Sequence, residues 1–359
     1  MWSGLASTIF GFLTGVGTAV QQSPARAFSW PASLGLRAGD LVEVRSRDEI
    51  LATLDATMAL DGMPFMPEML RHCGQRFRVS KRAEKSCDTI STGKGRRVRD
   101  AVHLADLRCD GGAHGGCQAL CLMWWKEAWL KPADDRTPVP VARSSPSHQA
   151  SEATLHAATC AKDPATGDTV YSCQVTRLLD FTERQDWDDP WQYLREVRYR
   201  NVGVFKTIRV LTRAVLNSVR RRFGRLPQPN LQGKCTDHTP AGTPLGIKAG
   251  DWVIVKSKEE IEATINAQKR NRGLAFDVEM LPYCGRRMQV LQKVDHIINE
   301  HTGRMQPLPN DCWILAGAWC KGYLSRNRLF CTRAIYSYWR EIWLRRADDP
   351  ENAAARDAG

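Results

Sequence analysis

The chain has 359 residues, which is more than one small module needs and predicts two or three domains. Hydrophobic residues make up 43% and charged residues 25%, the balance of a globular protein, which excludes wholesale disorder. No uninterrupted run of about 18 apolar residues occurs, which argues against a membrane-spanning helix, and the net charge of +12 predicts an acidic partner or surface.

Residues 1–35 are predicted to be an apolar leader. They contain Ala25-Arg26-Ala27, which has the form of a cleavage site in a secretory signal. The first basic residue, Arg26, follows the apolar run instead of preceding it, which argues against export. We therefore expect a cytoplasmic protein with reduced cysteines, and in the exported alternative the cysteines become disulfide candidates.

The chain contains an internal repeat. Residues 39–74 align without a gap with residues 250–285, and 17 of the 36 aligned positions are identical. The alignment continues through a shared cysteine and ends in a Trp-(Lys/Arg)-Glu-x-Trp-Leu segment in both halves. Such self-similarity predicts two copies of one domain. We call residues 36–135 the first copy and residues 237–349 the second copy.

Each copy is predicted to be a small β-rich unit. In the first copy, residues 41–45 alternate apolar and polar side chains, which is typical of a half-buried strand. Ser46 then predicts the N-cap of a short helix, and Glu49 completes a capping box. The second copy carries the same pattern, and these ingredients are typical of an SH3-like barrel. The predicted fold class is α+β and β-rich, with two tandem SH3-like small-barrel repeats joined by a linker and a basic helical segment.

The stretch between the copies has two parts. Residues 136–188 are rich in Pro, Ser and Thr at their start, which predicts a linker. Residues 189–226 are predicted to be helical, with a second helix from about Val204 to Phe223. The apolar residues of this helix form one stripe. The stripe comprises Val204, Ile208, Leu211, Val215 and Val219, widened by Phe205, Leu216 and Phe223. Residues 350–359 are predicted to be a tail.

The twelve cysteines are the main chemical signal in the sequence. In the first copy a Gly-rich loop with a histidine lies between cysteines. Zinc binds thiolate and imidazole tetrahedrally, and such a closed site would stabilise a small barrel. The predicted ligands of the first copy are Cys73, Cys109, Cys117 and Cys121, with His114 as a substitute fourth ligand. Those of the second copy are Cys284, Cys320 and Cys331, with Cys312 as the fourth.

Other states of the cysteines stay open at this point. The spacing in the first copy is not that of a standard zinc knuckle, and iron or an iron–sulfur cluster also accepts thiolates. Buried thiols are a further alternative, as are disulfides if the protein is exported.

The Trp-rich segment that ends each copy contains a glutamate, Glu127 or Glu341. Beside an indole wall such a carboxyl can have a raised pKa and act as an acid or a base, which makes the two residues weak catalytic candidates. The alternative is that the tryptophans form the core and the glutamate pairs with a neighbouring cation. We favour this alternative, because tryptophan burial dominates small cores. The same two interpretations, a catalytic carboxyl or a structural one, apply to Glu68 and Glu279.

Basic residues are concentrated in one segment. Residues 195–226 contain ten Lys or Arg and one acid. One interpretation is a surface that binds nucleic acid or anionic lipid headgroups. The other is a solvated helix face whose apolar side packs on the barrels. The predicted anion-binding residues are Lys206, Arg209, Arg213, Arg220, Arg221 and Arg222.

The second copy resembles a bacterial protein family without an assigned activity. The similarity rests on the segments EMLPYCG and YWREIWL and covers most of residues 170–346, but it implies no functional residue. From the cysteines we predict a metal-binding tandem-repeat protein, with zinc as the expected metal, that acts as an interaction or accessory protein for a protein partner. The alternatives are a metal-dependent enzyme with an open site in one copy, and a binder of nucleic acid or an anionic membrane surface.

Overall fold

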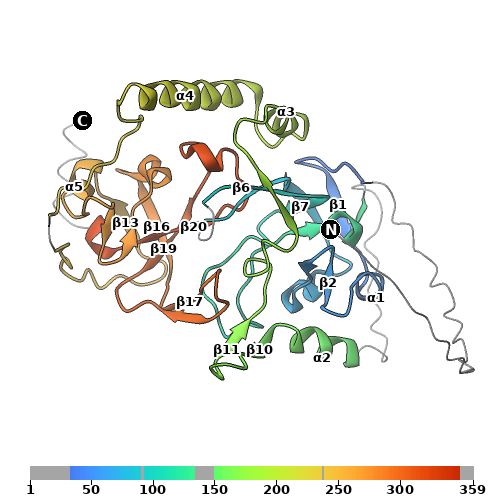
Figure 1. Cartoon of the computed structure of the whole chain (residues 1–359). Helices are drawn as coiled ribbons and strands as arrows, with labels where there is room; N and C mark the ends of the chain where they lie inside the picture. The colour runs from blue at the N-terminus through green and yellow to red at the C-terminus, as the bar shows by residue number, and fades with distance from the viewer. Residues whose placement is uncertain (1–32, 90–92, 134–148, 237, 348–359) are drawn as a thin grey trace, which may run out of the picture. The chain divides into compact units, whose positions relative to one another are not determined.

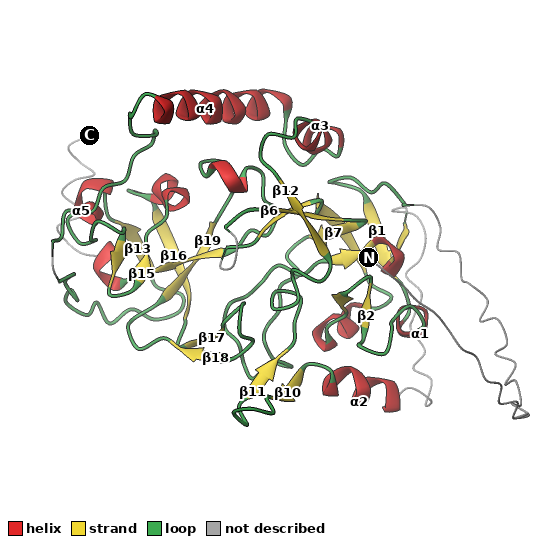
Figure 2. Cartoon of the chain, in the orientation of Figure 1, coloured by secondary structure: helices red, strands yellow, loops and turns green. Residues whose placement is uncertain are grey.

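The computed structural model describes residues 33–89, 93–133, 149–236 and 238–347 (Figure 1). The chain is a mixed α+β protein rich in strands, with curled antiparallel sheets (Figure 2). The predicted leader before residue 33 and the predicted tail at 350–359 lie outside the described residues.

A five-stranded sheet forms the centre of the first copy, in the order β8-β7-β4-β1-β9. Its strands are β8 (Trp125–Lys126), β7 (Ala101–Leu104), β4 (Arg76–Arg82), β1 (Leu41–Val44) and β9 (Leu130–Pro132). The predicted strand is confirmed in β1, where Val42 and Val44 are fully buried. The predicted capping box is present too, since α1 (Arg47–Leu51) begins after Ser46, whose hydroxyl accepts from the Glu49 amide at 3.3 Å.

The second copy contains a five-stranded sheet of corresponding order, β20-β19-β16-β13-β21. Its strands are β20 (Tyr336–Trp339), β19 (Trp313–Trp319), β16 (Arg287–Lys293), β13 (Trp252–Val255) and β21 (Leu344–Arg346). Helix α5 (Lys258–Glu262) follows β13 and begins after Ser257, which forms a capping box with Glu260. The local sequence signals that the two copies share therefore give the same local structure.

The tryptophans of the closing segments are core residues in both copies. Trp129 and Trp343 are fully buried, and each meets a phenylalanine edge-on, Phe65 at 5.1 Å and Phe276 at 5.2 Å between ring centroids. Each indole N–H donates to a threonine hydroxyl at 3.0 Å. Large aromatic rings buried in this way supply much of the hydrophobic stabilisation of a small sheet unit. The interpretation of these tryptophans as core residues is confirmed, and the SH3-like topology stays a prediction.

Short hairpins and 3-10 helices complete the two copies. The hairpins pair β2 (Ala59–Leu60) with β3 (Met63–Pro64), β14 (Arg270–Asn271) with β15 (Leu274–Ala275), and β17 (His296–Ile298) with β18 (Met305–Pro307). The 3-10 helices are η1 (Pro67–His72), η2 (Glu127–Trp129), η4 (Val278–Tyr283), η5 (Arg326–Arg328) and η6 (Glu341–Trp343).

The predicted linker at 136–188 is structured over its described part, from residue 149 onward. It contains α2 (Gln149–Ala157), β10 (Cys160–Lys162), β11 (Thr169–Tyr171) and β12 (Thr182–Gln185). Strand β12 pairs with β6 (Gly95–Val98) of the first copy, and β6 pairs with β5 (Lys85–Cys87). Leu155, Leu178 and Phe181 are buried in the core of the first copy. The prediction of a linker is therefore wrong for residues 149–188. The apolar side chains there are widely spaced in a polar stretch, but they are enough to pack the segment onto the first copy.

Two helices follow, as predicted: α3 (Trp191–Arg198) and α4 (Val204–Arg222). The interpretation in which the apolar stripe of α4 packs on the barrels does not hold for most of the stripe: Leu211 packs against a buried cluster, and the other stripe residues are exposed. Phe205 is 90% exposed and Phe223 is 73% exposed. The buried residues of α4 are Thr207, Val210, Ala214 and Asn217, on the side that packs beside Leu329 and Phe330 of the second copy. The helix thus uses its less apolar side for packing.

Candidate metal centre

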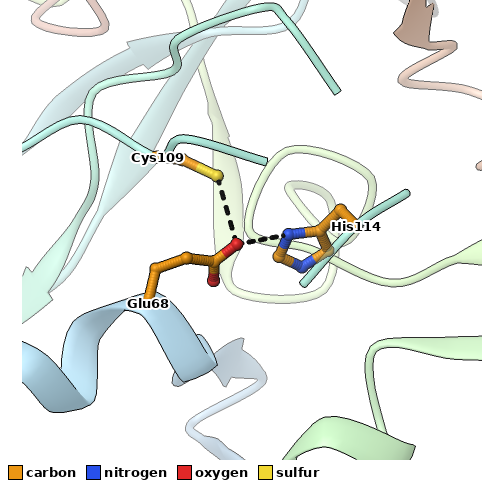
Figure 3. Close-up of side chains that lie close together, drawn as sticks. All are labelled: Glu68, Cys109 and His114. Atoms are coloured by element: carbon orange, nitrogen blue, oxygen red, sulfur yellow. Dashed lines mark hydrogen bonds and ion pairs between the residues drawn. The ribbon is translucent and has the colours of Figure 1, made fainter. Parts of the chain in front are cut away.

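Three potential metal ligands of the first copy lie within 4.8 Å of one another: Glu68, Cys109 and His114 (Figure 3). Glu68 lies on η1, and the other two lie in the loop between β7 and β8. His114 Nδ1 is 2.9 Å from Glu68 Oε1, and the Cys109 thiol donates to the same oxygen at 3.7 Å. No other group of three such residues meets this criterion in the described ranges.

The glycines in this loop allow the close turn that brings Cys109 and His114 together. Gly111 has φ +74°, and a Cβ there would lie 2.0 Å from the Cys117 carbonyl oxygen. Any larger residue at this position would therefore push the turn open. The His114 amide donates to the Gly111 carbonyl at 2.9 Å, and the Ala113 amide donates to Glu68 Oε1 at 3.1 Å.

The site is buried, and two of its polar atoms have no hydrogen-bond partner among the described residues. These atoms are Glu68 Oε2 and His114 Nε2. Glu68 is 8% exposed and His114 is 1% exposed. Buried polar atoms without a partner are costly, and an unseen ion is one of the few explanations for them. Nε2 is also a nitrogen through which imidazole binds metals.

The pKa values of the carboxyl and the thiol move in opposite directions. Burial alone would raise the pKa of Glu68, but the hydrogen bond and charge of His114 outweigh it and hold that pKa below its usual value. Burial raises the pKa of the Cys109 thiol, and the charge of Glu68 raises it further. Without a cation the thiol therefore stays protonated, and it would need a metal to ionise. It donates to Glu68 and not to the imidazole, so the group does not have the geometry of a cysteine nucleophile with a histidine base.

The structure brings together most of the ligands that we predicted for the first copy. Cys109, His114, Cys117 and Cys121 line one cavity of about 40 Å³, and Cys173 from the predicted linker joins them. Cys73 does not line this cavity and packs against the hydrophobic core of the first copy. We did not predict Glu68 as a ligand or Cys173 as a neighbour, because neither lies near the Gly-rich loop in sequence.

In the described part of the second copy, no such ligand group lies at the corresponding place. Glu279 aligns with Glu68, but both of its carboxylate oxygens accept backbone amides, from Tyr323 at 3.1 Å, Leu324 at 2.6 Å and Ser325 at 2.8 Å. Ser325 follows the shared cysteine by five residues, as His114 does in the first copy. In the second copy, hydrogen bonds from backbone amides of this loop therefore occupy the Glu279 carboxylate.

The cysteines that we predicted as ligands of the second copy are dispersed. Cys284 packs against the core of the second copy, and Cys312 is buried in a separate cluster with Val294, Ile314 and Tyr336. Cys320 and Cys331 line a cavity of about 480 Å³. None of the four belongs to a three-residue ligand group in the described part of the chain.

Cys331 has a different neighbour, Cys87 on β5 of the first copy. Both residues are buried, and the Cys331 thiol donates to the Cys87 sulfur at 3.0 Å. This hydrogen bond lowers the pKa of Cys87, whereas burial raises the pKa of Cys331. All twelve cysteines are free thiols, and these two line the same 480 Å³ cavity.

We expect oxidised glutathione to convert Cys87 and Cys331 into a disulfide. The Cys87 thiolate attacks the glutathione disulfide and releases one reduced glutathione, and the Cys331 thiol then displaces the second, losing its proton. Non-reducing peptide mapping by mass spectrometry should find the two residues in one cross-linked peptide. The exposed Cys160 should instead carry glutathione. Recovery of both residues as free thiols while Cys160 is modified would contradict this expectation.

The carboxylates of the two weak catalytic candidates, Glu127 and Glu341, accept hydrogen bonds from other groups of the chain. Glu127 accepts from the Leu36 amide at 2.9 Å, from the Ser33 hydroxyl at 2.7 Å and from the Arg82 guanidinium. Glu341 accepts from the Leu245 amide and from the Trp313 indole at 3.0 Å. These contacts match the structural interpretation, in which the glutamate pairs with a neighbouring group.

The predicted anion-binding residues of α4 fall into two sets. Lys206 and Arg213 contact Tyr323. The Lys206 ammonium lies 4.4 Å from the centre of the Tyr323 ring, and the Arg213 guanidinium donates to the Tyr323 carbonyl oxygen. The other four are Arg209, Arg220, Arg221 and Arg222. Arg213 is half-buried, and the other five of the six residues are exposed.

Comparison with known proteins gives no match: no family model, no curated protein and no solved structure is similar to this chain. None of the helices in the described ranges combines the length and the apolar character that a membrane crossing requires.

Proposed function

We propose that the chain is a zinc-binding tandem-repeat protein of the interaction or accessory type, with one metal ion held in the first copy by Glu68, Cys109 and His114. The observation that carries the proposal is the buried group of three ligands, in which two polar atoms have no partner among the described residues. A thiolate, an imidazole and a carboxylate are all ligands that zinc accepts. The two copies would be related β-rich units, of which only the first keeps the metal.

The donor set favours zinc over an iron–sulfur cluster. A cluster is held by four thiolates as a rule, and this group offers one thiol beside an imidazole and a carboxylate. Cys117, Cys121 and Cys173 line the adjoining cavity and are the available sources of a fourth ligand. A fourth protein ligand would close the site, as is typical of structural zinc.

The positions of the three ligands support a structural role for the metal ion, because the ligands come from two separate segments of the first copy. Glu68 lies on η1, and Cys109 and His114 lie in a loop rich in glycine. An ion between them would fix that loop against η1, as three backbone hydrogen bonds do around Glu279 in the second copy. The metal-dependent enzyme stays the alternative, and it requires a coordination position that water or substrate occupies.

The proposal is tested by elemental analysis of the purified, untagged chain. We expect one zinc per chain, and a loss of zinc affinity of about tenfold or more in His114→Ala and Cys109→Ser. The matched controls are His156→Ala and Cys160→Ser, which remove an exposed histidine and an exposed thiol. Their zinc content should equal that of the wild type.

Two outcomes would overturn the proposal. One is a wild-type chain that holds no metal after purification and takes up none from added zinc. The other is a zinc content that is equal in His114→Ala, Cys109→Ser and their controls. Circular dichroism of each variant separates loss of a ligand from loss of the fold.

A further inference from the structure

Exposed apolar side chains are concentrated on α3, α4 and the turn after them. Among the described residues, ten of the thirteen large hydrophobic side chains that are exposed fall between residues 191 and 226. On α4 they are Val204, Phe205, Ile208, Val215, Leu216 and Val219, and Phe223 follows the helix. An exposed apolar patch of this extent on a folded chain usually marks an interaction site.

These side chains occupy the side of α4 that faces away from the packed protein. The buried residues of the helix recur at Thr207, Val210, Ala214 and Asn217, which defines the packed side. At about 100° per residue, Ile208 and Val219 lie on the opposite side. Figure 1 shows α4 next to α3, and Trp191 and Leu194 of α3 are likewise exposed, at 66% and 59%.

The charge of α4 has one sign. The helix contains six Lys or Arg and no Asp or Glu. Arg209 and Arg220 project from the flank of the apolar side, since their helical positions lie between it and the packed side. Arg220, Arg221 and Arg222 are at the C-terminal end and are exposed.

We propose that α4 lies in the plane of a membrane surface that contains anionic lipid, with its apolar side among the acyl chains and its arginines on the headgroups. A strongly amphipathic helix with basic residues beside its apolar side binds membranes in this way. Nucleic acid would pair with the arginines but would leave Phe205, Ile208 and Phe223 in water. The six charged residues prevent the helix from crossing the bilayer, in agreement with the lack of a spanning helix in the described ranges.

The proposal is tested by flotation of the full chain with vesicles of phosphatidylcholine, with and without phosphatidylglycerol. We expect binding to the anionic vesicles and about tenfold weaker binding to the neutral ones. The triple variant Phe205→Ser, Ile208→Ser, Phe223→Ser should lose about tenfold or more of its affinity for anionic vesicles. Its matched control is Leu291→Ser, an exposed apolar residue on β16, which should bind as the wild type does.

The charge contribution is tested with Arg209→Glu, Arg220→Glu. This variant should bind anionic vesicles more weakly and with a smaller dependence on salt. Absence of vesicle binding by the wild type would overturn the proposal, as would equal binding by the wild type and the triple serine variant. Binding to a DNA oligonucleotide that the serine variant retains, without vesicle binding, would assign the surface to nucleic acid and overturn it too.

Discussion

Replacement of Arg82 by alanine should lower the free energy of unfolding by about 3–5 kcal/mol. The Arg82 side chain is 2% exposed and lies between two buried acids, Glu84 and Glu127. Its Nε donates to Glu84 at 2.8 Å, and Nη1 donates to Glu127. Removing the guanidinium leaves the Glu127 carboxylate buried without its cation, whereas Glu84 keeps its ion pair with Arg195 at 3.0 Å. Loss of one partner is the costly way to break a buried ion pair. Urea unfolding followed by tryptophan fluorescence measures the change.

The second copy provides a control for this prediction. Lys293 aligns with Arg82, and it pairs with Asp295 at 2.7 Å on the surface, where its side chain is 53% exposed. Lys293→Ala should therefore cost no more than about 1 kcal/mol, as exposed ion pairs do. Equal losses for Arg82→Ala and Lys293→Ala would contradict the argument, because the difference rests on burial.

The same geometry bears on the interpretation of Glu127 as a catalytic acid or base. A catalytic carboxyl needs a free oxygen directed at substrate. Glu127 is 3% exposed, and both of its oxygens accept hydrogen bonds from Ser33, Leu36 or Arg82. Its position in the Trp-rich segment is explained by this buried network.

Local signals in the sequence predicted local structure well. The capping boxes at Ser46 and Ser257 are present, and so are the strands that precede them. Such features depend on residues within one turn or one strand, so a short window of sequence contains the information. The helix at α4 was predicted for the same reason, within one residue of its observed end.

Features that depend on contacts between distant segments were harder to predict. The periodicity of α4 gave its apolar side, but not which side packs, because that choice depends on Leu329 and Phe330, more than a hundred residues away. The candidate metal centre was predicted only in part, because one of its residues is distant in sequence from the other two. His114 and Cys109 are close in sequence, whereas Glu68 reaches them only through the packing of η1.

The second large effect that we expect concerns His103, which lies between the two copies. It is fully buried on β7. Its Nδ1 is 2.9 Å from the Met123 carbonyl oxygen and its Nε2 is 3.1 Å from the Thr332 hydroxyl of the second copy. Burial lowers the pKa of His103 to about 3, although the hydrogen bond to Met123 acts in the opposite direction. The folded chain therefore keeps this imidazole neutral at pH values where the unfolded chain protonates it.

The sign of the pH dependence follows from this difference. Between pH 6.5, the ordinary pKa, and about 3, the unfolded chain binds one more proton at His103 than the folded chain does. The free energy of unfolding therefore has its full value, as far as His103 determines it, above pH 6.5. It falls as the pH decreases, by up to about 1.4 kcal/mol for each pH unit. Protonation would also place a cation beside the Thr332 contact, so acid should weaken the packing of the two copies against each other.

We expect His103→Gln to flatten this part of the stability curve. Glutamine does not titrate, and its amide can still donate a hydrogen bond to the Met123 carbonyl. Between pH 6.5 and 5 the wild type should lose about 2 kcal/mol more than the variant does, as measured by urea unfolding at each pH. His156→Gln is the matched control, because His156 is exposed and should leave the wild-type slope unchanged. Parallel curves of stability against pH for the wild type and His103→Gln would contradict the prediction. They would mean that His103 is protonated equally in the folded and unfolded chains, in spite of its burial against Met123 and Thr332.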